Sequence, residues 1–144
     1  MVNPVDALLT LTALLAVTLG VGIVVRWRQG RPQHHVPNEI VDPERLGAKR
    51  LGDTATLLQF STELCSRCPG VHRTLSAVAE GREGVLHLDV DLTHRPDIAK
   101  HFSVLQTPTT LILDGEGAIQ TRFGGIPNRD VVELELARLT SEAE

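Results

Sequence analysis

The sequence predicts an α/β domain, built on a mixed sheet flanked by helices and preceded by one N-terminal transmembrane helix. Three observations support this fold class. A long uncharged segment lies near the N-terminus, strand-like and helix-like segments alternate in the rest of the chain, and Asp114-Gly115-Glu116-Gly117 separates the last two strands as a hairpin turn would. A parallel β-α-β start followed by an antiparallel hairpin gives a sheet with both strand orientations and helices on its faces.

The N-terminal segment has the length and composition of a membrane anchor. No charged residue occurs from Ala7 to Val25. As a helix, residues 5–25 extend roughly 30 Å, the thickness of the hydrocarbon layer. We therefore predict that residues 1–28 anchor the protein in the cell membrane as a single span. A cleaved signal peptide is the alternative, but no Lys or Arg precedes the apolar run and Arg26-Trp27-Arg28 follows it directly.

Charges beside this segment predict its orientation. Arg26, Arg28 and Arg31 follow the apolar run, whereas the N-terminal side offers only the α-amino group and Asp6. The positive-inside rule then predicts a cytoplasmic domain, with an extracytoplasmic domain as the alternative.

The rest of the chain divides into a linker and an acidic domain. Residues 29–52 contain several prolines and glycines without an apolar period, which predicts a linker ahead of a domain at 53–144. Residues 51–144 carry eight Lys or Arg against fourteen Asp or Glu. A net charge of this sign argues against nucleic acid as a partner.

Apolar periodicity predicts the order β-α-β-α-β-β-α in the domain. The expected elements are a strand at 55–60, a helix through Val71 that ends near Glu80, a strand at 85–90, a helix at 94–102, strands at 109–113 and 118–123, and a helix capped by Asn128.

The two cysteines of the chain, Cys65 and Cys68, lie two residues apart where the first strand gives way to a helix. Unpaired N–H groups and the helix dipole stabilise a thiolate there, so the spacing predicts redox chemistry. A structural disulfide is less favoured, because so small a loop gains little stability. A zinc site is also less favoured, because His72 adds only one ligand at a usual spacing. No cofactor is expected, since the two sulfurs carry the electrons.

Three segments give the chain a resemblance to the thioredoxin family over residues 53–142. They are Phe60-Ser-Thr-Glu-Leu-Cys65-Ser-Arg-Cys68-Pro69, Val104-Leu-Gln-Thr107-Pro108-Thr109 and Gly124-Gly125. The resemblance implies a thioredoxin-like sheet and a membrane-anchored thiol-disulfide oxidoreductase with a part in cell redox homeostasis. It also implies Cys65 as attacking thiolate, Cys68 as resolving thiol, a cis-proline at Pro108, and substrate-binding backbone at Thr107. The implied partners are protein disulfide or dithiol substrates and a reductase or other electron donor.

The chain departs from the family pattern at four positions. Leu64, Ser66 and Arg67 replace the usual Trp and Gly-Pro, and Gln59 replaces a buried Asp. We expect Arg67 to favour the Cys65 thiolate by lowering its pKa, which makes the couple more oxidising than thioredoxin.

Two other functions are consistent with the sequence. Thr62 and Cys65 have the Thr-X-X-Cys spacing of thiol peroxidases, although Leu58 stands where those enzymes have proline. A non-catalytic module, or one that handles metal through Cys65, Cys68 and His72, is the second alternative. Glu63 and His72 are candidate proton shuttles for Cys68, outside the main prediction.

Overall fold

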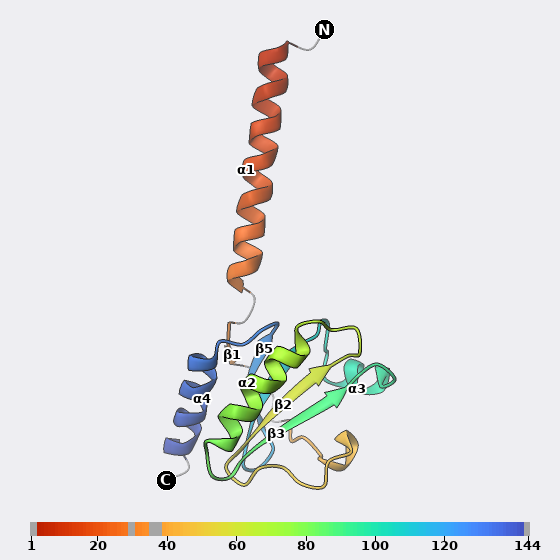
Figure 1. The fold of residues 1–144 in the computed structure, drawn as a ribbon, viewed down its shortest axis with the longest axis vertical. Helices are drawn as coiled ribbons and strands as arrows, with labels where there is room; N and C mark the ends of the chain where they lie inside the picture. Colours follow the sequence, from red (N-terminus) through yellow and green to blue (C-terminus); the bar gives the residue numbers. More distant parts are fainter. Residues whose placement is uncertain (1–2, 29–30, 35–38, 143–144) are drawn as a thin grey trace.

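The structure is a computed structural model that describes residues 3–28, 31–34 and 39–142. Figure 1 shows a long helix, α1 (Pro4–Arg28), projecting from one end of a domain in which helices flank a sheet. This arrangement confirms the predicted fold class.

Helix α1 contains residues 5–25, the predicted apolar span, and residues 1–2 of the predicted anchor lie outside the described residues. It is 25 residues long, none of its side chains is buried, and its most apolar part has a mean hydropathy of 2.5. A helix that is apolar on every face and packs against nothing has the properties of a membrane span. By length and composition α1 is able to cross a membrane.

The sheet has the strand order β1-β5-β4-β2-β3. Its strands are β1 (Gln33–His34), β2 (Ala55–Ser61), β3 (Val85–Asp91), β4 (Thr109–Asp114) and β5 (Ile119–Gly124). β2 is parallel to β3 and antiparallel to β4, and β4 and β5 form an antiparallel hairpin. The sheet is therefore mixed, as the sequence predicts.

Side chains of the central strand β2 alternate between two cores. Leu57 packs on one face with Val71 and Leu75 of α2 (Cys68–Glu80) and with α4 (Arg129–Glu142). Leu58 and Phe60 pack on the other face, the side of α3 (Pro96–His101). Since both faces are covered, β2 is buried along nearly its whole length.

The hairpin turn is held by the carboxylate of Asp114. Its Oδ1 accepts hydrogen bonds from the backbone N–H groups of Glu116 and Ala118, each at 2.9 Å. Gly117 has φ +86°, a conformation that glycine adopts without strain. The predicted hairpin is present, and its turn sequence explains it.

Part of the segment predicted as a linker packs on the domain. Ile40 forms a bridge with Ala118, Val41 is 3% exposed, and Leu46 of the short 3-10 helix η1 (Glu44–Leu46) is 8% exposed. Both buried side chains join the core on the α3 side. The predicted domain start at residue 53 therefore leaves out two core residues.

Candidate redox site

Cys65 and Cys68 form a disulfide in the loop between β2 and α2. The S–S distance is 2.08 Å and the two Cα atoms lie 5.4 Å apart. Cys68 is the first residue of α2 and is 4% exposed, whereas Cys65 is half-buried. Cys65 is therefore the more accessible of the two cysteines.

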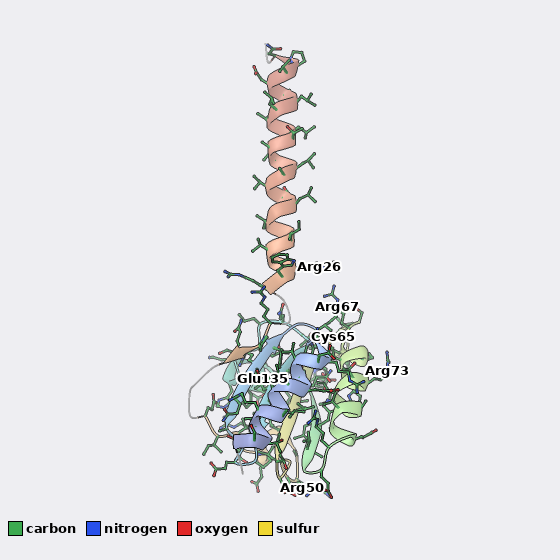
Figure 2. The ribbon with its side chains drawn as sticks, turned by 90° about the vertical axis from the view of Figure 1, so that its left-hand side faces the viewer. Arg26, Arg50, Cys65, Arg67, Arg73 and Glu135 are labelled. Atoms are coloured by element: carbon green, nitrogen blue, oxygen red, sulfur yellow. A yellow bond between two sulfur atoms is a disulfide. The ribbon has the colours of Figure 1, made fainter. Side chains whose placement is uncertain are left out.

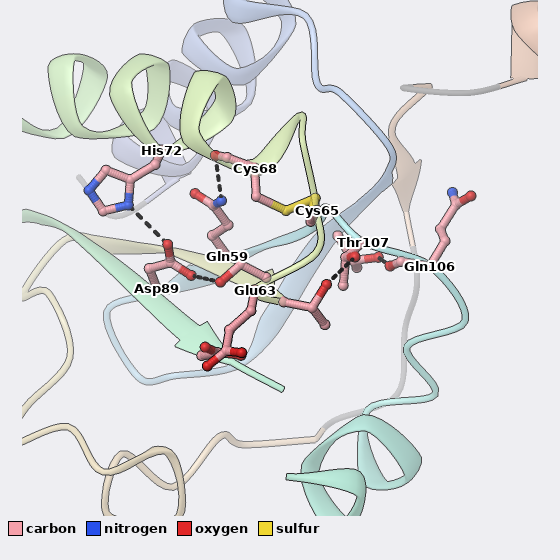
Figure 3. The surroundings of a disulfide bond; sticks show 12 residues. Gln59, Glu63, Cys65, Cys68, His72, Asp89, Gln106 and Thr107 are labelled. Atoms are coloured by element: carbon pink, nitrogen blue, oxygen red, sulfur yellow. Dashed lines mark hydrogen bonds and ion pairs between the residues drawn. A yellow bond between two sulfur atoms is a disulfide. The ribbon is translucent and has the colours of Figure 1, made fainter. Parts of the chain in front are cut away.

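The loop before β4 lies against this disulfide. The Thr107–Pro108 peptide bond is cis, and the hydroxyls of Thr62 and Thr107 are 3.2 Å apart. Figure 3 shows Thr107 beside Cys65. The structure thus brings Cys65, Cys68, Thr107 and Pro108 together from two segments that lie far apart in the chain.

Gln59 lies beneath the disulfide, at the centre of a hydrogen-bond chain. It is fully buried, and its Nε2 donates to the Cys68 carbonyl at 3.1 Å (Figure 3). Its Oε1 must then accept from His87 Nε2 at 3.2 Å, and His87 Nδ1 accepts from the Ser76 hydroxyl at 2.9 Å. This order applies to a neutral imidazole, because a protonated His87 would donate from Nδ1 to the Ser76 oxygen instead.

The surroundings of His87 favour that neutral form. Burial, followed by the nearby charge of His72, lowers the pKa of His87 to about 4, and Asp89 opposes the shift only in part. At neutral pH the groups from Ser76 through Gln59 to Cys68 are therefore uncharged.

An acid does lie nearby, one strand further along the sheet. Asp89 on β3 is the register partner of Gln59 on β2. Its Oδ1 accepts from the Ser61 hydroxyl at 2.6 Å, and its Oδ2 is 3.0 Å from His72 Nδ1 (Figure 3). No local motif in the sequence marks Asp89 as a site residue. Its signal is the parallel pairing of β2 with β3, which places residue 89 beside residue 59.

The disulfide and the His72–Asp89 pair share one open cleft. The cleft is lined by Ser61, Thr62, Glu63, Cys65, Cys68, Pro69, His72, Arg73 and Asp89. Glu63 and His72, the two candidate proton shuttles, both line this cleft.

Arg67 is exposed at the start of α2 and lies at the same end of the domain as Cys65 (Figure 2). Its predicted influence on the Cys65 thiolate stays a prediction, because in the disulfide this thiol does not titrate.

Three loops that carry or adjoin the site residues have exposed apolar side chains, and their exposure was not predicted from the sequence. Leu64 is 97% exposed, Leu105 96% and Ile126 53%. Leu64 comes directly before Cys65, Leu105 stands two residues before Thr107, and Ile126 directly follows Gly125. We call the three the apolar rim. Exposed apolar side chains beside a reactive group are typical of a docking surface.

Among the residues that the structure describes, no three or more His, Cys, Asp or Glu side chains form a metal-binding group.

Comparisons with known proteins agree with this geometry. No protein-family model and no curated protein matches the chain. Among solved structures, thioredoxin from Fasciola hepatica is 22% identical with a TM-score of 0.52, over 60% of this chain and 82% of that one. Chloroplastic thioredoxin z is 19% identical with a TM-score of 0.57, over 76% of this chain and 99% of that one. A mutant thioredoxin from Halobacterium salinarum is 17% identical with a TM-score of 0.58, over 75% of this chain and 96% of that one.

The domain has the thioredoxin fold. At these identities the likeness concerns the fold, and function has to be argued from the site. A thioredoxin fold that carries a Cys-X-X-Cys disulfide where β2 meets α2 supports thiol-disulfide redox chemistry at a general level.

Proposed function

We propose that the protein is a membrane-tethered thiol-disulfide oxidoreductase that exchanges disulfides in protein substrates through Cys65 and Cys68. One observation carries the proposal. The disulfide lies at the start of α2, with its more accessible cysteine beside the Thr107–Pro108 loop and the apolar rim.

In the reducing direction, the reaction transfers two electrons in two steps. The Cys65 thiolate attacks one sulfur of a substrate disulfide, an S–S bond forms between them, and the other substrate sulfur leaves as a thiolate and takes up a proton. The Cys68 thiolate then attacks the Cys65 sulfur, which forms the intramolecular disulfide and releases the second substrate thiol. Cys65 attacks first because it is the accessible cysteine.

The proton of Cys68 needs an acceptor before the second step. Gln59 cannot take it, since an amide does not titrate near neutral pH. His72 lies four residues after Cys68 on the same face of α2, lines the same cleft, and is oriented by Asp89. In our proposal His72 accepts this proton, directly or through one water.

Substrate binding falls to the loop before β4. The backbone of Thr107 and Pro108 stands at the start of a strand, where an extended peptide is able to add by strand pairing. The apolar rim adds contact area on either side of the sulfur.

The cellular setting also belongs to the proposal. Residues 1–28 anchor the protein in the cell membrane, and the positive-inside rule favours a cytoplasmic domain. We propose that the folded domain begins near residue 39, within the predicted linker. A reductase or another electron donor returns the disulfide to the dithiol and links the protein to cell redox homeostasis.

The test uses the full chain in detergent or nanodiscs, reduced beforehand and freed of reductant. We expect it to reduce insulin disulfides stoichiometrically and to form its own disulfide, whereas Cys65→Ser, a near-isosteric variant, does neither. A folded wild-type protein that leaves insulin oxidised would contradict the proposal. If that protein instead binds Zn²⁺ with loss of both free thiols, the metal-handling alternative is favoured.

A further inference from the structure

The chain that leaves α1 reaches the sheet through β1. β1 is antiparallel to β5, with Gln33 paired to Arg122 and His34 to Thr121. Residues that precede Gln33 therefore point toward Gly124, the last residue of β5. The chain toward α1 therefore leaves the sheet at the end where β5 finishes.

The disulfide lies at the same end of the sheet, after the last residue of β2. Gly124 pairs with Thr109 at the start of β4, and the N–H of Gly125 donates to the Pro108 carbonyl at 2.8 Å. The views in Figures 1 and 2 agree with this. α2 begins at the end of the domain nearest α1, and Cys65 lies at that end, whereas Arg50 lies at the opposite end.

The short connection restricts how far the domain can turn over. Five peptide units join Arg28 to Gln33, so they span at most about 18 Å. To place the opposite end of the domain, which carries the β4–β5 turn, against a membrane, these residues would have to run back along β5. The strand from Arg122 to Ile119 alone takes up about 10 Å of that length, and the hairpin turn lies beyond it. At most about 8 Å of the connection would remain beyond the strand, so with α1 in a bilayer the orientation with the disulfide end toward the headgroups is favoured.

The side chains at this end fit a surface near a membrane. Arg26 and Arg28 end α1 with positive charge, and Arg67 is exposed beside the disulfide. The apolar rim defined above extends from the same end. Cations favour the anionic headgroup layer, and an exposed apolar rim favours an apolar protein surface.

We propose that the partner of the Cys65–Cys68 pair is a protein embedded in the same bilayer, whose reactive disulfide or dithiol lies at headgroup level. This inference rests on the proposed function and narrows its substrates. Two electrons pass from the Cys65–Cys68 dithiol to the partner disulfide, or from a partner dithiol to the Cys65–Cys68 disulfide, with one S–S bond formed and one broken. A shared bilayer confines both molecules and raises their effective concentration.

The orientation is tested first, on the full chain in nanodiscs that contain a headgroup-labelled quencher lipid. One sample carries a maleimide fluorophore on Cys65 in the Cys68→Ser variant. The matched control carries it at the opposite end, in Arg50→Cys with both native cysteines changed to Ser. We expect quenching of the Cys65 label to be at least roughly threefold stronger, because contact quenching reports proximity to the headgroups. Equal or reversed quenching overturns the inference.

The partner is tested with three mixed-disulfide probes that release a fluorescent thiol. Two are transmembrane peptides in the same nanodisc as the reduced full chain, one with its cysteine at the end of the apolar segment and one with it beyond a stiff helical spacer of about 40 Å. The third is a soluble peptide. We expect the headgroup-level probe to react roughly tenfold faster than the distant probe. A helical insertion of the same length between Arg28 and Gln33 should reverse that preference.

The three probes separate the two claims. If none reacts, the proposed function fails, and this inference fails with it. If the soluble probe reacts while the membrane probes react at equal rates, the oxidoreductase stands and the membrane-embedded partner is overturned. The same holds if Cys65 is quenched but the headgroup-level probe shows no advantage, because the apolar rim then contacts lipid.

Discussion

At the scale of residues, the feature that distinguishes this site is the uncharged hydrogen-bond chain under the disulfide. Gln59 donates to the Cys68 carbonyl, and burial lowers the pKa of His87 so that its imidazole is neutral at neutral pH. The nearby acid, Asp89, lies on the next strand and is paired with His72. In the proposed mechanism, the proton of Cys68 therefore goes to His72 in the open cleft and not to a buried acid beneath Cys68.

His87 makes stability depend on pH in a defined window. Its pKa is about 4 in the folded protein and about 6.5 when unfolded, so the unfolded chain binds more protons between these values. Stability is lost as the pH falls from about 6.5 toward about 4. We expect the melting temperature of wild type to fall more over that range than that of His87→Gln, which keeps an amide hydrogen bond but does not titrate.

The control for this prediction is the change in melting temperature of both proteins below pH 4, where His87 no longer contributes a difference. Asp91, Asp97 and Glu133 have lowered pKa values, so their contribution disappears at lower pH and does so equally in both proteins. If the melting temperatures of the two proteins fell by the same amount between pH 7 and pH 4, His87 would not be neutral in the folded protein.

Arg67 allows a test of thiolate activation. An exposed cation near a thiolate contributes about 0.2–1 kcal/mol, so Arg67→Ala should slow alkylation of reduced Cys65 below its pKa by up to about fivefold. Arg67→Lys is the matched control, because it keeps the charge. The rate is followed with iodoacetamide at pH 6 in the Cys68→Ser background. Identical rates in all three proteins would mean that solvent screens the guanidinium.

The site residues that could be predicted are those marked by a short motif or by their spacing along the chain. Cys65 and Cys68 follow from their spacing, and Pro108 from its short Thr-Pro-Thr motif. Asp89 and Leu105 were missed because their positions depend on strand register and loop exposure, which spacing along the chain does not encode.

At the scale of elements, every predicted helix and strand of the domain is present, with ends that differ by a few residues. Strong apolar periodicity and the Asp114 turn account for this agreement. The packing of residues 39–52 on the sheet was not predicted. The two buried side chains of this segment, Val41 and Leu46, are isolated apolar residues among prolines and charges, so no period reveals that they pack on the sheet.

That packing predicts a large effect of truncation. Each buried aliphatic side chain contributes about 1.5–3 kcal/mol, so loss of Val41 and Leu46 should cost about 3 kcal/mol or more out of a typical 5–15. We expect residues 31–144 to unfold at distinctly higher urea concentration than residues 53–144. Leu46→Ala in the longer chain should lower its stability by about 2–5 kcal/mol. Equal midpoints for the two chains would show that residues 39–52 do not stabilise the domain.

At the scale of the whole molecule, a short connection joins an exposed apolar helix to a folded domain. The apolar helix α1 ends with arginines. The disulfide of the acidic domain lies at the end of the sheet where the chain from α1 joins it. Composition predicts the two parts. The direction in which the disulfide faces could not be predicted from sequence, because it depends on β1, a strand of two residues without a pattern of its own.

The central claim is that Cys65 attacks protein disulfides and Cys68 resolves the product. It is tested most directly by trapping with full-length Cys68→Ser expressed in cells, followed by non-reducing electrophoresis and mass spectrometry of the linked peptides. We expect mixed disulfides through Cys65 that disappear on reduction and are absent from Cys65→Ser/Cys68→Ser. A folded, membrane-inserted Cys68→Ser protein that traps no partner through Cys65 would contradict the account.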